Sequence, residues 1–138
     1  MTAPILLDTC AVLWTAADAQ ITEEAEAALQ EAFEADREVF VSPISAWELG
    51  ILAARGRQRF PTEPAAWFNL FLEKSGCHLS SLSPEILVDS SFLPGTPPRD
   101  PADRIVICTA RKLGYQVMTR DREILEYSEQ GHVLGIEC

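Results

Sequence analysis

The sequence has few of the features that mark membrane, zinc or disulfide-rich proteins. Its 138 residues include only four cysteines and two histidines, and none of them form a pair or cluster at metal-ligand spacing, which argues against a zinc site or a disulfide framework. No apolar run approaches the ~18 residues of a membrane span. The first residues, MTAPILLDTC, carry no basic flank or cleavage site. We therefore expect one cytoplasmic domain over residues 1–138.

Basic residues are also scarce. The chain has 11 Lys and Arg against 21 Asp and Glu, a net charge of −10, whereas phosphate binding depends on Lys and Arg that release counterions. The charge is uneven, however: residues 1–48 hold ten acids and one base, and residues 49–138 hold eleven acids and ten bases. The second half can therefore contact a nucleic acid, while most acids of the first half fit a solvated helix.

Short apolar segments alternate with helical patterns along the chain. Strands are predicted at 4–8, 38–42, 77–82, 115–119 and 132–136, and helices at 22–36, 44–55, 63–76, 84–92 and 100–113. The histidines, His78 and His132, fall in two of these strands and are assigned no chemistry. The alternation predicts an α/β fold, a three-layer α/β/α sandwich with a central parallel sheet of about five strands.

Acidic residues follow the ends of several predicted strands. Asp8 ends the first strand, Glu48 lies on the helix after the second, and Asp121 comes just past the fourth. Ligands of open α/β sheets bind beyond the carboxyl ends of the strands, so these acids are expected at one site. Asp100 is predicted to cap the helix that starts beside it, and the spacing leaves both capping and ligand roles open for Asp103.

Carboxylates gathered without a counter-charge repel one another, and a bound cation removes that repulsion. Oxygen ligands suit Mg²⁺ or Mn²⁺, and the lack of nearby His and Cys disfavours zinc. Such a site supports phosphodiester hydrolysis by metal-activated water, with a free carboxylate as proton acceptor.

Three segments resemble the successive signatures of PIN-domain ribonucleases of the toxin class. They are LLDTCAVLW at 6–14, VFVSPISAWELGI at 39–51 and RDPADRIVICTARKLGYQVMTRD at 99–121. The resemblance spans nearly the whole chain. It implies a Mg²⁺-dependent (or Mn²⁺-dependent) endoribonuclease, the toxin of a toxin–antitoxin pair, with a cognate antitoxin, an RNA substrate and a homodimeric state.

The resemblance also implies roles for individual residues. The metal-binding and catalytic acids become Asp8, Glu48, Asp103 and Asp121, so Asp103 is favoured over Asp100 as the ligand. Thr9, Ser45 and Thr119 match small hydroxyl residues that would orient the carboxylates. The sequence departs from the family at Cys10, where many relatives have His, and at Ala102, where a large apolar residue is usual.

Arginines near these acids in the sequence are predicted to contact RNA phosphates. They follow the Glu48 helix, bracket the Asp103 motif or flank Asp121: Arg55, Arg57, Arg99, Arg104, Arg120 and Arg122.

Two other functions are compatible with part of the pattern. A Mg²⁺-dependent phosphatase of the haloacid-dehalogenase kind also ends its first strand with Asp, but it needs a second Asp two residues on, where this chain has Cys10. A catalytically inactive acidic module that only binds a partner requires some of the four acids to be missing, and all four are present.

Overall fold

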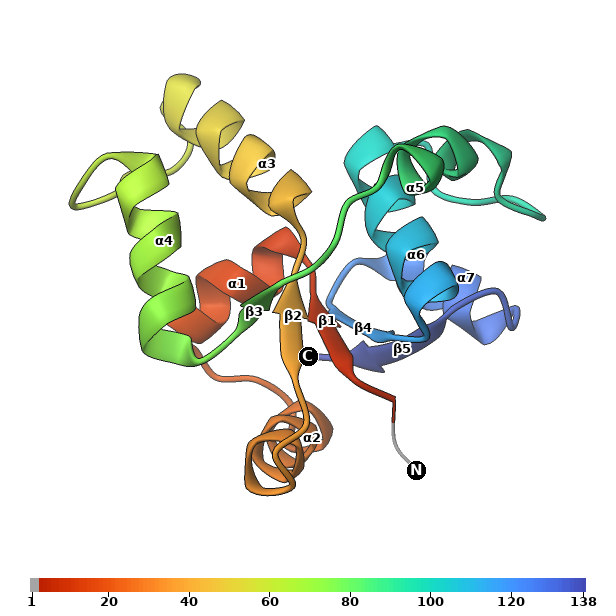
Figure 1. Ribbon diagram of the computed structural model, residues 1–138, viewed down its shortest axis with the longest axis horizontal. Coiled ribbons are helices and arrows are strands. Elements are labelled where there is room, and N and C mark those ends of the chain that lie inside the picture. Colours follow the sequence, from red (N-terminus) through yellow and green to blue (C-terminus); the bar gives the residue numbers. More distant parts are fainter. Residues whose placement is uncertain (1–2) are drawn as a thin grey trace.

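The computed structural model describes residues 3–138. Its strands form one five-stranded sheet (Figure 1). Its strands are β1 (Ile5–Leu7), β2 (Val39–Val41), β3 (His78–Leu79), β4 (Gln116–Thr119) and β5 (Leu134–Glu137). They lie in the order β3-β2-β1-β4-β5, and every neighbouring pair is parallel. The predicted central parallel sheet is confirmed, and all its strands end at the same edge, called here the carboxyl edge.

Helices cover both faces of the sheet. One group is α1 (Thr9–Ala16), α2 (Glu23–Glu34), α3 (Pro43–Ala54) and α4 (Pro64–Ser75); the other is α5 (Pro84–Asp89), the short 3-10 helix η1 (Ser90–Phe92), α6 (Pro101–Leu113) and α7 (Arg122–Glu129). In Figure 1, α3 and α4 lie on the left, α5, α6 and α7 lie on the right, and α2 lies below the sheet. Within residues 3–138, no helix is long and apolar enough to cross a membrane.

The core is divided in two by the sheet. Ile5 and Leu7 of β1 face a cluster that includes residues of α1, α2 and α4. Leu6, on the other face, packs against residues of α6 and α7. All three side chains are at most 1% exposed, because a central parallel strand is covered on both faces and is therefore continuously apolar.

Four helices begin at the carboxyl edge of the sheet. Their N-cap residues are Asp8 for α1, Ser42 for α3, Asp100 for α6 and Asp121 for α7, and each cap side chain accepts a hydrogen bond from a backbone N–H of its own helix. Caps of this kind satisfy backbone donors that the first helical turn leaves unpaired. Three of the four caps are acids, so capping brings carboxylates to one edge.

The structure departs from the sequence prediction in places. Helices α1 and α7 are not among the predicted elements. Strand β3 has only two residues, so the predicted strand at 77–82 is too long, and β5 begins at Leu134. His132 therefore precedes the strand instead of belonging to it; its ring packs against Tyr127, with 4.6 Å between centroids.

The two sides of α6 provide a test of the core. Ile107 is fully buried, whereas Leu113 of the same helix is 41% exposed. We expect Ile107→Ala to lower the free energy of unfolding by about 2–5 kcal/mol, through lost burial and the cavity left behind. Leu113→Ala is the control and should change it by less than about 0.5 kcal/mol. Urea denaturation measures both, and equal effects would contradict the core assigned here.

Candidate active site

Asp8 is the most enclosed of the predicted acids, with 6% of its surface exposed. Its Oδ1 accepts a hydrogen bond from the Ala11 N–H at 2.8 Å, and its Oδ2 accepts one from the Thr119 hydroxyl. Thr119 is fully buried and also accepts from the Asp121 N–H at 2.9 Å. A single hydroxyl thus joins the acid at the end of β1 to the backbone of the acid after β4.

Glu48 is held by a hydroxyl pair from α1 and α3. The Thr9 hydroxyl donates to Glu48 Oε1 at 2.5 Å, and the Ser45 hydroxyl lies 3.0 Å from the Thr9 oxygen. A hydroxyl has one hydrogen, so Thr9 donates to Glu48 while Ser45 donates to Thr9. The structure therefore places Thr9, Ser45 and Thr119 in contact with the acids or with each other, where the prediction needs them.

The other two acids lie at the starts of helices. Asp103 is in the first turn of α6, and its N–H donates to Asp100 Oδ1 at 3.1 Å. Asp121 caps α7, with its Oδ1 accepting from the Ile124 N–H at 3.0 Å. Because both helices start at the carboxyl edge, these acids lie at the same edge as Asp8.

Burial raises the pKa of Asp8 and of Glu48 above the ordinary carboxyl range. The hydrogen bond from Thr119 opposes the shift at Asp8, and the hydrogen bond from Thr9 opposes it at Glu48. The Asp121 charge adds to the shift at Asp8, as the Asp8 charge does at Glu48. Each acid therefore lies in the field of another.

Burial and neighbouring charges together raise the pKa of Asp103 to about 8. Burial is the largest cause, followed by the negative charges of Asp100, Asp121, Glu48 and Asp8, in that order. The four predicted acids are thus electrostatic neighbours. Asp100 makes the largest of these charge contributions to the pKa of Asp103. The sequence predicts Asp100 only as a helix cap, and its local sequence carries no signal for this electrostatic role.

Cys10 reaches the surface beside these acids. Desolvation of its thiol raises the pKa to about 11, and the charges of the four predicted acids add to the rise. The residue that departs from the family pattern therefore faces the carboxylates as a neutral thiol.

The donor set fits a hard divalent cation, because it consists of carboxylate oxygens that repel one another. In this conformation, however, no three His, Cys, Asp or Glu side chains among residues 3–138 are spaced to hold a metal ion. Repelling carboxylates separate when no cation joins them. Binding an ion would therefore require these side chains to move together.

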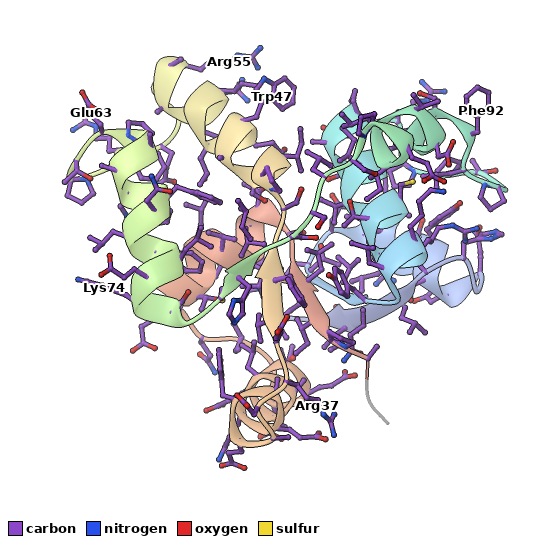
Figure 2. The ribbon with its side chains drawn as sticks, viewed as in Figure 1. Arg37, Trp47, Arg55, Glu63, Lys74 and Phe92 are labelled. Atoms are coloured by element: carbon purple, nitrogen blue, oxygen red, sulfur yellow. The ribbon has the colours of Figure 1, made fainter. Side chains whose placement is uncertain are left out.

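The six predicted arginines divide into two groups. Arg55, Arg57 and Arg99 have exposed side chains, and Figure 2 shows Arg55 at the end of α3 that lies away from the sheet. The others are engaged within the protein: Arg104 with the Pro98 carbonyl, Arg120 with the Gln20 carbonyl and the Trp14 ring, and Arg122 with Glu126 and Glu129.

Comparison with known proteins identifies the family. The PIN domain model matches residues 5–130. The chain belongs to the PIN domain family. The chain is 29% identical over 120 residues to ribonuclease VapC22 of Mycobacterium tuberculosis, an alignment that covers 87% of this chain and 88% of the relative.

Solved structures share the PIN fold at lower sequence identity. VapBC2 from Rickettsia felis, bound to a DNA fragment from its promoter, superposes with a TM-score of 0.66 at 11% identity, covering 96% of this chain and 98% of the other. FitAcB from Neisseria gonorrhoeae gives a TM-score of 0.56 at 22% identity, covering 96% of each chain. These structures confirm the PIN-like α/β/α sandwich.

The raised pKa of Asp103 predicts how stability depends on pH. Its carboxyl is protonated up to about pH 8 in the folded, metal-free PIN domain but ionises near pH 4 when unfolded. The folded state therefore holds the Asp103 proton more tightly than the unfolded state does. The contribution of this difference to the free energy of unfolding is complete below pH 4 and is lost as the pH rises through 8. Asp103→Asn should therefore flatten the fall in unfolding free energy between pH 5 and pH 8.5.

Urea denaturation with a chelator present measures this slope. Glu34→Gln, at an exposed position on α2, is the control and should follow the wild type. If the unfolding free energy of Asp103→Asn fell with pH as steeply as that of the wild type, the pKa of Asp103 would not be raised in the folded state.

Proposed function

We propose that this PIN domain is a metal-dependent endoribonuclease and the toxin of a toxin–antitoxin pair. The observation that carries the proposal is a set of acids whose charges act on one another at the carboxyl edge: Asp8, Glu48, Asp103 and Asp121. These four acids are the proposed cation-binding and catalytic residues. The similarity to ribonuclease VapC22 supports RNA as the substrate. The family match also leaves the phosphatase alternative without support.

Mg²⁺ or Mn²⁺ is the cation proposed, since the available donors are carboxylate oxygens. When bound, such a cation provides a water nucleophile at neutral pH and stabilises the charge that develops on the phosphate. Thr119 orients Asp8, and the pair Thr9 and Ser45 orients Glu48. A carboxylate with a raised pKa is suited to accept the proton that the attacking water loses.

RNA contacts are proposed for arginines near the acids. The exposed side chains of Arg55, Arg57 and Arg99 are the strongest candidates, because each can reach a phosphate without losing an internal partner. Arg104, Arg120 and Arg122 would have to exchange an existing contact for a phosphate. RNA binding by an acidic protein then depends on its second half.

An antitoxin partner is supported by the VapBC and FitAB complexes that share the fold. An apolar groove of about 480 Å³ lies between α1, α2 and α4 and includes Phe33 and Leu70, which are 50% and 42% exposed. Apolar surface of this kind is typical of protein interfaces. We propose that the antitoxin covers this groove and extends a basic segment to the acids.

A homodimer in the cytoplasm is the assembly proposed. Large apolar side chains are exposed on α3 and on the α5–η1 segment, at Trp47, Val88 and Phe92. Figure 2 shows Trp47 and Phe92 projecting away from the ribbon. A second copy of the chain would remove this surface from water.

Cleavage of RNA tests the central proposal. Single-stranded RNA should be cleaved with Mg²⁺ or Mn²⁺ and left intact with a chelator. Asp8→Asn and Glu48→Gln should each lower the rate at least about 100-fold, because loss of a ligand removes several kcal/mol of charge stabilisation. Lack of cleavage by the folded wild type with either ion would favour the inactive binding module instead.

Salt dependence tests the RNA surface. In an Asp8→Asn background, which prevents cleavage, Arg55→Ala and Arg57→Ala should each reduce the slope of log affinity against log salt by roughly 0.7. Arg37→Ala removes an arginine that pairs with Glu31 and should leave the slope unchanged. If both Arg55→Ala and Arg57→Ala showed the salt slope of the parent, RNA would not contact the end of α3 or the turn after it.

A further inference from the structure

Three arginines are sequence neighbours of proposed ligands: Arg122 pairs with glutamates of its own helix, and the other two bind other segments of the chain. Arg104 follows Asp103, and its Nε donates to the Pro98 carbonyl at 2.6 Å. Arg120 precedes Asp121; its Nη2 donates to the Gln20 carbonyl at 2.5 Å, and its guanidinium lies 3.8 Å from the centre of the Trp14 ring. In both cases the guanidinium binds a backbone carbonyl of a different segment.

The charges of these arginines do not offset the pKa shifts of the acids. Burial and other carboxylates raise the pKa of Asp8, Glu48 and Asp103, and neither arginine lowers any of the three. Burial also raises the pKa of Tyr127 and of Cys138; the charges of Arg111 and then Arg104 lower the first, and the Arg120 charge lowers the second, which the Asp8 charge raises further. The guanidinium groups therefore do not neutralise the carboxylates beside them in sequence.

The Arg104 contact fixes the start of α6. Residues 93–99 form the loop before the Asp100 cap, and both ends of that loop are held: the Tyr127 hydroxyl donates to the Pro94 carbonyl and Arg104 to the Pro98 carbonyl. Asp100 in turn accepts from the Asp103 N–H. The position of Asp103 thus depends on a loop that Arg104 binds.

The Arg120 contact fixes the end of β4 in the same way. Gln20 lies between α1 and α2, and Trp14 is on α1, the helix that Asp8 caps. Arg120 therefore ties the segment carrying Asp121 to the segment that follows Asp8. This link acts in parallel with the Thr119 hydroxyl, which joins the same two acids from inside.

We propose that Arg104 and Arg120 are positioning residues, which hold the backbone beside Asp103 and Asp121 so that repelling carboxylates can converge on a cation. The inference rests on the proposed function for the cation. It assigns both arginines a role other than phosphate contact. Arg111 provides a matched comparison, because it also donates to a backbone carbonyl, that of His132, but near the far end of α6.

The experiment measures Mn²⁺ affinity by calorimetry without RNA. Arg104→Ala and Arg120→Ala should each weaken Mn²⁺ binding by about 10–100-fold, as expected for groups that orient metal ligands. Arg111→Ala should leave Mn²⁺ affinity unchanged. Arg104→Lys, which keeps one donor for Pro98, should restore part of the affinity, whereas Arg120→Lys should restore less, since it loses the planar stacking on Trp14.

RNA binding gives the second readout. In the Asp8→Asn background, Arg104→Ala and Arg120→Ala should keep the salt slope of the parent. Unchanged Mn²⁺ affinity in both variants, or a slope reduced by roughly 0.7, would overturn the inference; the reduced slope would mean phosphate contact. If an alanine variant does not fold, the corresponding methionine variant, which keeps the apolar stem without a donor, decides by the same two measurements. Failure of the wild type to bind Mn²⁺ would instead refute the proposed function.

Discussion

Repulsion among carboxylates at the carboxyl edge of the sheet is the constraint on which the other features of this site depend. Parallel strands end together, and the helices that follow them begin there with acidic caps. The positive ends of these helices and the hydroxyls of Thr9 and Thr119 offset part of the charge. Burial is the largest cause of the raised pKa values at Asp8, Glu48 and Asp103, and the charges of neighbouring carboxylates add to each rise. A divalent cation would supply the missing positive charge.

The distribution of basic residues follows from the same constraint. An arginine bound directly to the acids would occupy the place of the cation. Of the three arginines adjacent to these acids in sequence, Arg104 and Arg120 bind backbone carbonyls and Arg122 pairs with Glu126 and Glu129. The exposed Arg55 and Arg57 lie past the end of α3, at a distance along the helix from Glu48. Within residues 3–138, the acids are therefore free of ion pairs with these arginines.

Much of this arrangement could be predicted from the sequence. The continuous apolar run of β1 and the Ser42-Pro43 start of α3 have local signals, and the rule on strand ends places Asp8, Glu48 and Asp121 at one edge. Spacing alone could not choose between Asp100 and Asp103, because a first-turn acid serves as cap or ligand; only the family resemblance favoured Asp103.

Other features have weaker signals or none. Helix α1 is apolar without helical periodicity, so its sequence pattern fits a buried strand equally well. Helix α7 does have a helical signal, a cap at Asp121 and apolar residues at Ile124 and Tyr127, which the prediction missed. Strand β3 pairs with β2 at only two positions, His78 with Phe40 and Leu79 with Val41, although the sequence predicts a strand over 77–82. The carbonyl partner of Arg120 is 100 residues away, and no local pattern encodes such a contact.

Proton release on metal binding tests the central claim most directly. At pH 7 the Asp103 carboxyl, with a pKa of about 8, is mostly protonated without metal, and a cation must displace that proton to bind. Calorimetry of Mn²⁺ binding in two buffers of different ionisation enthalpy should show proton release at pH 7 and much less at pH 9. Asp103→Asn should reduce the release at pH 7 by about one proton, and any remaining release comes from Asp8 and Glu48, whose pKa values are also raised. Mn²⁺ binding by the wild type without proton release at pH 7, or no Mn²⁺ binding at all, would contradict the account.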